Sequence, residues 1–228
     1  MEPALEAGGT LELPESESHH VFKVLRGREG DHVEVVDGAG RLFLAALRGG
    51  READVLEELA TAGVVESEIS LYQAVLKGGR MDLVVEKATE VGVSTIVPVL
   101  AERGVVNPRE GKVGRWRRVA EAAARQSLRF RVPEVREPVA FEGAVREVGE
   151  AGVLLHTAPG LEAVESVVGL PVCLFVGPEG GWGEGELRLA EEAGLAFAQL
   201  GPYRLRSETA GVIAVARARA ALEGRVRF

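Results

Sequence analysis

The residues best suited to chemistry lie in one glycine-rich segment, Phe175–Gly183, which reads FVGPEGGWG. A buried strand is expected to lead here through a tight turn into a helix. In α/β folds this is where ligands bind, because glycines let backbone amides approach a bound molecule closely. The spacing is not that of a dinucleotide fingerprint, and the chain contains no GxxxxGK[ST] phosphate loop. The segment therefore predicts a ligand site without a nucleotide-phosphate motif; the alternative is that the glycines only tighten the turn.

Two further turns are expected just past the ends of strands, at Leu155–Gly160 and Leu200–Thr209. The second is predicted to start a helix with Ser207 as its N-cap. Amides at a helix start attract hydrogen-bond acceptors and anions, and Arg206 adds positive charge beside them. If the three turns converge on one crevice, they form a pocket suited to a nucleoside-like ligand.

Other site chemistries have little support. His19 and His20 are adjacent, so they diverge on a helix and cannot chelate one ion together. His32, His156 and the single cysteine, Cys173, complete no zinc ligand set and allow no internal disulfide. No GxSxG sequence is present, so the nucleophile turn of a hydrolase is absent. We therefore expect no metal.

The elements that must position these turns fall into two halves. The first 65 residues or so are mostly β and are expected to form a small barrel, whereas strands and helices alternate from Ile69 onward. This alternation predicts a parallel sheet with helices on both faces. A shift in composition near Val65–Glu68 places the domain boundary, giving domains 1–67 and 68–228.

The first domain is expected to contain a helical stretch, Ser16–Leu25, and the strands His32–Val36, Arg41–Leu47 and Ala53–Leu59. The expected strands of the second are Ile69–Val75, Thr95–Leu100, Val153–His156, Val172–Val176 and Phe197–Leu200. Its expected helices are Met81–Val91, Val113–Leu128, Phe141–Val148, Glu184–Ala193 and Ser207–Leu222.

The charge is unevenly distributed. The net charge of −8 alone argues against a nucleic-acid partner. However, residues 103–136 hold ten basic and only three acidic residues, a local charge of +7. This predicts a phosphate-facing surface on an acidic body, the alternative being a solvated helix face rich in arginine. A hydrophobic content of 46%, no apolar run of membrane-spanning length and no basic-then-apolar leader indicate a globular cytoplasmic protein.

Five groups of residues occur in an order that is typical of one protein family. They are His19–Arg26 with Gly30-Asp31; Lys77–Asp82 with Glu86–Gly92; Glu102-Arg103 and Arg125–Ser127 with Arg131–Pro133; Gly177–Gly181; and Leu205–Ala210. Together they resemble the SPOUT class of RNA methyltransferases. Within that class they resemble the family that methylates N3 of one uridine in bacterial 16S ribosomal RNA of the small subunit.

The resemblance implies a PUA-like N-terminal barrel for RNA docking and a C-terminal domain with a deep trefoil knot. It also implies a homodimer that holds S-adenosylmethionine (SAM) in the knot crevice, with S-adenosylhomocysteine as product. The implied cofactor-binding residues are Leu155, His156, Thr157, Ala158, Gly177, Pro178, Glu179, Gly181, Leu200, Gly201, Leu205, Arg206, Ser207, Thr209 and Ala210. The implied RNA-binding residues are Lys23, Arg26, Arg80, Lys87, Arg125, Gln126 and Arg129.

A mechanism follows from this resemblance as a hypothesis. Methyl transfer requires alignment of donor and acceptor, and N3 of uracil must lose its proton before it can attack. Arg206 is expected to stabilise the resulting anion, and Glu208 either to orient Arg206 or to accept the proton directly or through water. The alternative for this pair is a helix-start ion pair without a catalytic role.

Three other functions remain open at this point. One is a related SPOUT enzyme that acts on another RNA or another atom, and one is a non-catalytic RNA-binding factor in ribosome assembly. The intact glycine loops and the Arg206–Ala210 segment argue against the second. A nucleotide-dependent oxidoreductase is disfavoured by the absent phosphate fingerprint.

Overall fold

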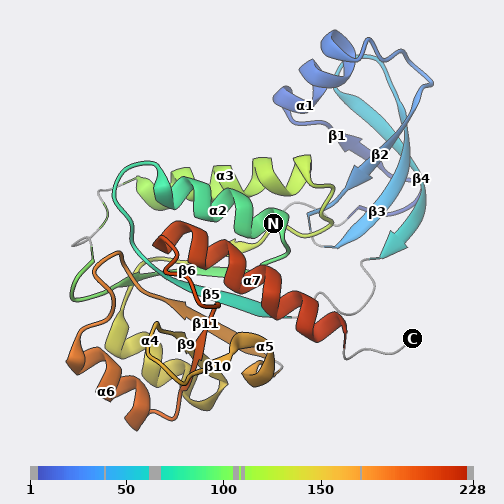
Figure 1. Cartoon of the computed structure of the whole chain (residues 1–228). Coiled ribbons are helices and arrows are strands. Elements are labelled where there is room, and N and C mark those ends of the chain that lie inside the picture. Colours follow the sequence, from blue (N-terminus) through green and yellow to red (C-terminus); the bar gives the residue numbers. More distant parts are fainter. Residues whose placement is uncertain are drawn as a thin grey trace. The chain divides into compact units, whose positions relative to one another are not determined.

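The chain divides into two compact units in a computed structural model (Figure 1). The model describes residues 5–38, 40–61, 68–104, 108, 111–169 and 171–224. One unit comprises Met1–Val65 with Arg129–Arg131, and the other comprises Glu66–Leu128 with Val132–Phe228. The roles expected of domains 1–67 and 68–228 stay a prediction.

The first unit is built on a four-stranded antiparallel sheet in the order β1-β4-β3-β2. Its strands are β1 (Thr10–Glu12), β2 (His32–Val36), β3 (Arg41–Leu47) and β4 (Glu52–Thr61). Helix α1 (Glu15–His19) continues into the single π-helical turn η1 (His20–Val24). Large apolar side chains such as Phe43 and Leu47 are fully buried between these elements. The predicted strands His32–Val36 and Arg41–Leu47 are confirmed, whereas β1 is too short to show an alternating pattern.

The second unit contains an eight-stranded parallel sheet in the order β10-β12-β9-β11-β5-β6-β7, with β8 also paired to β6. Its strands are β5 (Ile69–Ala74), β6 (Thr95–Leu100), β7 (Glu134–Val135), β8 (Val139–Ala140), β9 (Gly152–Leu155), β10 (Glu162–Ala163), β11 (Val172–Val176) and β12 (Ala196–Gln199). The parallel sheet is therefore confirmed. The predicted strands Thr95–Leu100 and Val172–Val176 match it residue for residue.

Helices cover both faces of this sheet, because successive side chains of a strand point to opposite sides. Ile69 and Leu71 of β5 belong to one core cluster, and Tyr72 and Ala74 belong to another. Helices α2 (Arg80–Glu90), α3 (Lys112–Gln126) and α7 (Ser207–Glu223) lie over the first cluster, as does the short α5 (Val164–Val167). Helices α4 (Phe141–Val148) and α6 (Glu184–Glu192) cover the second, and the 3₁₀ turn η2 (Gly149–Ala151) follows α4.

The C-terminal half of helix α7 is bonded to two neighbouring helices. The Arg219 guanidinium donates hydrogen bonds to the carbonyl oxygens of Val91 and Gly92 at the end of α2. One half-turn earlier, Arg217 forms a two-pronged ion pair with Glu165 of α5. These contacts hold the C-terminal half of α7 against the other helices on this face of the sheet. None of the helices in the described part of the chain is long and apolar enough to cross a bilayer.

Candidate functional site

A cavity of about 340 Å³ opens at the carboxyl ends of β9, β11 and β12. Because these strands are parallel neighbours, the turns that follow them meet at one edge of the sheet. The cavity is lined by the turn after β9, the glycine-rich turn after β11, and the segment that connects β12 to α7. Its lining residues are Leu155, His156, Thr157, Val176, Gly177, Pro178, Glu179, Gly181, Trp182, Leu200, Gly201, Tyr203, Arg204, Leu205, Arg206, Ser207 and Ala210. The three turns singled out in the sequence thus enclose one space.

The lining agrees closely with the residues expected to bind a cofactor. Of those fifteen residues, only Ala158 and Thr209 do not line the cavity. Four lining residues were not expected, namely Val176, Trp182, Tyr203 and Arg204. The one available signal for Trp182 was a large aromatic residue among glycines, which are small enough to pack against it.

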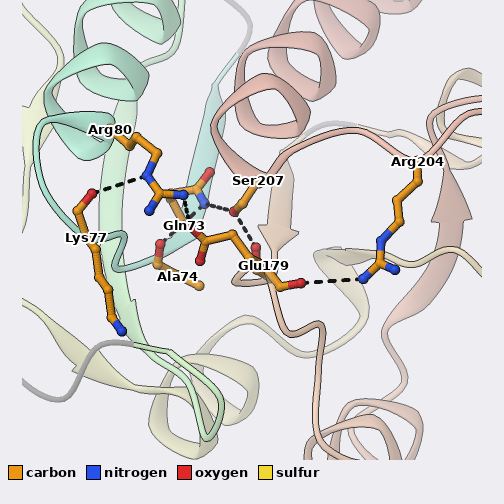
Figure 2. Close-up of polar contacts among 8 residues, drawn as sticks. Gln73, Ala74, Lys77, Arg80, Glu179, Arg204 and Ser207 are labelled. Atoms are coloured by element: carbon orange, nitrogen blue, oxygen red, sulfur yellow. Dashed lines mark hydrogen bonds and ion pairs between the residues drawn. The ribbon is translucent and has the colours of Figure 1, made fainter.

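A buried hydrogen-bond chain joins two of the three turns (Figure 2). The Ser207 hydroxyl donates to the carbonyl oxygen of Gly177, and the Gln73 side-chain amide donates to the Ser207 oxygen at 3.0 Å. Gln73 is fully buried at the end of β5 and also donates to the Ala74 carbonyl at 3.3 Å. The glycine-rich turn and the start of α7 are therefore hydrogen-bonded to each other and to β5, an interior strand of the sheet.

This chain corrects the expectation that Ser207 caps α7. The N-cap is Arg206, with extended backbone angles and no capping hydrogen bond from its side chain, and Ser207 is the first helical residue. The Ser207 hydroxyl donates its hydrogen bond to Gly177, a residue 30 positions away, so a tertiary contact outweighs the local capping preference.

Replacing Ser207 with alanine tests this fastening. The change leaves the Gly177 carbonyl and one Gln73 N–H bond without their shared partner, in a region where Ser207 itself is 5% exposed. We expect the free energy of unfolding to fall by about 1–3 kcal/mol, as measured by denaturant titration. Ser207→Thr keeps the hydroxyl and should retain most of the stability; an alanine variant as stable as the parent would contradict the fastening role.

The third turn is tied to the glycine-rich turn by Trp182. Its indole N–H donates to the Leu155 carbonyl at 3.2 Å, and the ring lies 4.8 Å from that of Phe141. A Cβ atom at position 177 would come within 3.1 Å of the indole, so glycine there permits the close approach of ring and backbone. The end of the glycine-rich turn is held by Glu186, whose carboxylate accepts from the Gly183 amide at 2.8 Å. The cavity walls are thus mutually bonded and pre-formed.

Arginines dominate the electrostatics of the cavity rim. Arg80 forms an ion pair with the Glu179 carboxylate, and Arg204 donates to the Glu179 carbonyl at 3.4 Å (Figure 2). Arg103 donates to the neighbouring Gly180 carbonyl at 3.3 Å. The Arg206 side chain lines the cavity, and its guanidinium has no hydrogen-bond or ion-pair partner among the described residues, whereas its backbone carbonyl accepts from the Ala210 amide within α7.

Glu208, the second residue assigned a catalytic role, lies elsewhere. It is buried, 8% exposed, in the first turn of α7 and does not line the cavity. One of its carboxylate oxygens, Oε2, has no hydrogen-bond partner. Among the described residues there is no ion pair between Arg206 and Glu208, and the catalytic roles of both residues stay a prediction.

The residues expected to bind RNA are distributed over both units. Arg80 lies at the cavity rim, whereas Lys87, two turns further along α2, forms ion pairs with Glu86 and Glu90. Arg125 and Gln126 are exposed at the end of α3. Lys23, Arg26 and Arg129 belong to the first unit. No group of three His, Cys, Asp or Glu side chains able to hold a metal ion occurs among the described residues.

The chain is similar to known proteins over most of its length. A family model described as an RNA methyltransferase domain matches residues 65–219, and one described as an RNA methyltransferase PUA domain matches residues 13–57. A Synechocystis protein named ribosomal RNA small subunit methyltransferase E is 33% identical over 224 residues, covering 94% of this chain and 74% of that protein. Its Mycobacterium tuberculosis namesake is 34% identical over 230 residues, covering 92% and 86% respectively.

Two solved structures are also similar. One is a ribosomal RNA small subunit methyltransferase E from Neisseria gonorrhoeae bound to S-adenosyl methionine, with 31% identity and a TM-score of 0.86 over 96% of this chain and 95% of that one. The other is a Legionella pneumophila protein in complex with the cofactor SAM, with 31% identity, a TM-score of 0.84 and the same coverage.

Proposed function

This chain belongs to the family of SAM-dependent methyltransferases of small-subunit ribosomal RNA, and we propose that it methylates N3 of one uridine in 16S ribosomal RNA. The observation that carries the proposal is the cavity enclosed by three mutually bonded turns, with the Arg206 guanidinium on its wall, which has no partner in the described part of the chain.

The residues of the cavity fit SAM. A space of about 340 Å³ lies within the ~300–1,000 Å³ range of small-molecule sites. The glycine-rich turn offers backbone groups for the polar parts of the molecule, and Leu155, Val176 and Leu205 offer an apolar wall. Bound SAM supplies a methyl group on a positively charged sulfur. The chain's part is to hold that donor, align the acceptor base and exclude water.

Arg206 is the proposed catalytic residue. Loss of the N3 proton leaves a negative charge that spreads onto the two carbonyl oxygens of uracil. A planar guanidinium that has no partner within the described residues is free to bond these oxygens, and it stabilises the anion most when the charge is fully developed. Arg206 thereby lowers the energy needed to form the nucleophile.

Glu208 is proposed as the second contributor, acting on Arg206 or on the proton through water. Its buried carboxylate lies two residues after Arg206 in the first turn of α7, where the helix dipole favours negative charge. Because it does not line the cavity, a water-mediated path is the form of this role that the geometry favours.

We further propose the architecture that the family resemblance implies. The match to a PUA domain and the irregular β3–β4 register, which curves a sheet, support an N-terminal barrel. A trefoil knot is supported by the path after β12. Strand β12 pairs with β9 on the side away from β11 and β5. The chain after β12 then runs back across the sheet, contacts the Gly177 turn that follows β11, and places α7 against α2. A homodimer and a cytoplasmic location complete the proposal.

RNA binding should depend steeply on salt, despite the net charge of −8. Helix α3 presents exposed arginines, among them Arg118, which makes no ion pair with a described residue. Each phosphate contact with single-stranded RNA contributes about −0.7 to the slope of log affinity against log salt. Arg118→Gln is expected to flatten the slope by about that amount, as measured by filter binding at several salt concentrations. The matched control is Arg146→Gln on α4, across the sheet, which should leave the slope unchanged; a flat plot for the parent would contradict the α3 surface.

Incubation with labelled SAM and separated ribosomal subunits from cells lacking this activity tests the proposed function. We expect label in the RNA of the small subunit and none in that of the large subunit. Label confined to the large subunit or to transfer RNA would overturn the choice of substrate. Binding of SAM without any RNA labelling would instead favour a non-catalytic assembly factor.

A further inference from the structure

Tyr203 is an unusual residue for its position. It lines the cavity, yet 82% of it is exposed, and it is the single exposed aromatic side chain among the described residues. The other tyrosine, Tyr72, and both tryptophans are buried. An aromatic ring left in solvent at the mouth of a pocket loses the benefit of burial until a partner covers it.

The surroundings of Tyr203 define the charge of that partner. Arg204 and Arg206 follow it on the same connecting segment and line the same cavity. Arg80 and Arg103 reach the adjacent glycine-rich turn from two other parts of the chain. Four guanidinium groups against the Glu179 carboxylate give the rim a positive charge on a protein that is acidic as a whole. An anionic partner with flat rings fits this combination, and a single-stranded nucleic acid has both properties.

The exposure of the Tyr203 ring suits contact with the acceptor base and not contact with SAM, the methyl donor. A side chain that packed on the donor's adenine would belong to the cavity wall, where Trp182 is 4% exposed and Leu155 is 8% exposed. Tyr203 lines the same cavity but is far more exposed than these two residues. A base that is to be methylated must leave its stack and pass the rim, and unstacked bases gain most from an aromatic surface.

We infer that the Tyr203 ring is the stacking surface for the unstacked acceptor base, holding its N3 edge toward Arg206 while Arg204 contacts an adjoining phosphate. This assignment rests on the proposed function and deepens it. It makes Tyr203 a substrate-binding residue whose contribution comes from its flat ring and not from its hydroxyl.

The test compares Tyr203→Ala with Tyr203→Phe, using unmethylated small ribosomal subunits as substrate. Base–aromatic stacking of ordinary strength corresponds to about a 10- to 100-fold loss in kcat/KM for RNA when the ring is removed. Tyr203→Phe should retain nearly all of the parent's kcat/KM. Calorimetric affinity for SAM should be the same in all three proteins.

A spectroscopic variant gives a second reading that does not depend on turnover. Tyr203→Trp places an exposed indole at the rim, and its emission should be quenched when the subunits are added in the presence of S-adenosylhomocysteine. The native tryptophans, Trp116 and Trp182, are 2% and 4% exposed and provide the unquenched background in the parent protein.

Three outcomes would overturn the inference about Tyr203. They are full activity of Tyr203→Ala, a Phe variant as impaired as the Ala variant, and a loss confined to SAM affinity, which would assign the ring to the donor. Each of these presupposes a parent protein that methylates small-subunit RNA. A parent that transfers no methyl group at all would instead refute the proposed function, so the two failures are distinguishable.

Discussion

Replacing Arg206 with alanine is expected to lower kcat for RNA methylation by about 10²- to 10³-fold, the usual cost of losing one preorganised charge-stabilising group. The loss should fall on kcat because the guanidinium is needed most when the N3 anion has formed. SAM affinity, measured by calorimetry, should change little, since the walls of the cavity are held by Ser207 and Trp182 and not by Arg206.

Two variants make the Arg206 result specific. Arg206→Lys keeps the charge but loses the planar fork, and should recover only part of the rate. Arg204→Ala removes a neighbouring arginine that also lines the cavity but already donates to the Glu179 carbonyl; it should raise KM for RNA with a smaller effect on kcat. An Arg206→Ala protein that binds SAM normally and works at the full rate would refute the catalytic role.

Replacing Trp182 with alanine is expected to cost about 3–5 kcal/mol of unfolding free energy and to abolish measurable SAM binding. The indole is 4% exposed, packs against Phe141 and lies close to the backbone of Gly177. Removal of the indole leaves a void between two of the turns that form the cavity. It also removes the N–H group that donates a hydrogen bond to the Leu155 carbonyl oxygen. Denaturant titration and calorimetry measure the two effects separately.

Trp116 provides a matched control for this experiment. It is buried to a similar extent, 2% exposed, but lies in α3 and does not line the cavity. Trp116→Ala should lose comparable stability and keep its affinity for SAM at temperatures where it is folded. If both alanine variants lose SAM affinity equally, Trp182 contributes only general stability and the pre-formed cavity is not what binds the cofactor.

The sequence predicted the parallel half of the molecule well because its patterns are long and repeated. The apolar run Val172–Val176 before a glycine-rich turn could only be a buried strand, and Phe141–Val148 has a clear helical period. Parallel strands then require their following turns to share an edge, so the composition of the cavity followed from topology. The two-residue strands β7, β8 and β10 and the four-residue α5 are too short to produce any period.

What the sequence missed are contacts between distant residues. Gln73 stands in a mostly apolar strand, and nothing near it indicates a bond to Ser207, which lies 134 positions later. The expected cap at Ser207 was wrong for a similar reason, because its hydroxyl donates to the carbonyl oxygen of Gly177, which lies 30 positions away. Tyr203 illustrates a different limit, because only the structure shows that its ring is exposed while lining the cavity.

The proposed function requires that this cavity deliver a methyl group to a uracil nitrogen held beside Arg206. The most direct measurement is mass spectrometry of nucleosides from small-subunit RNA after reaction of the purified protein with SAM carrying a labelled methyl group. We expect the label to be recovered in 3-methyluridine from a single position. Recovery of the label in a 2′-O-methylated nucleoside or in a methylated base other than uracil would contradict it.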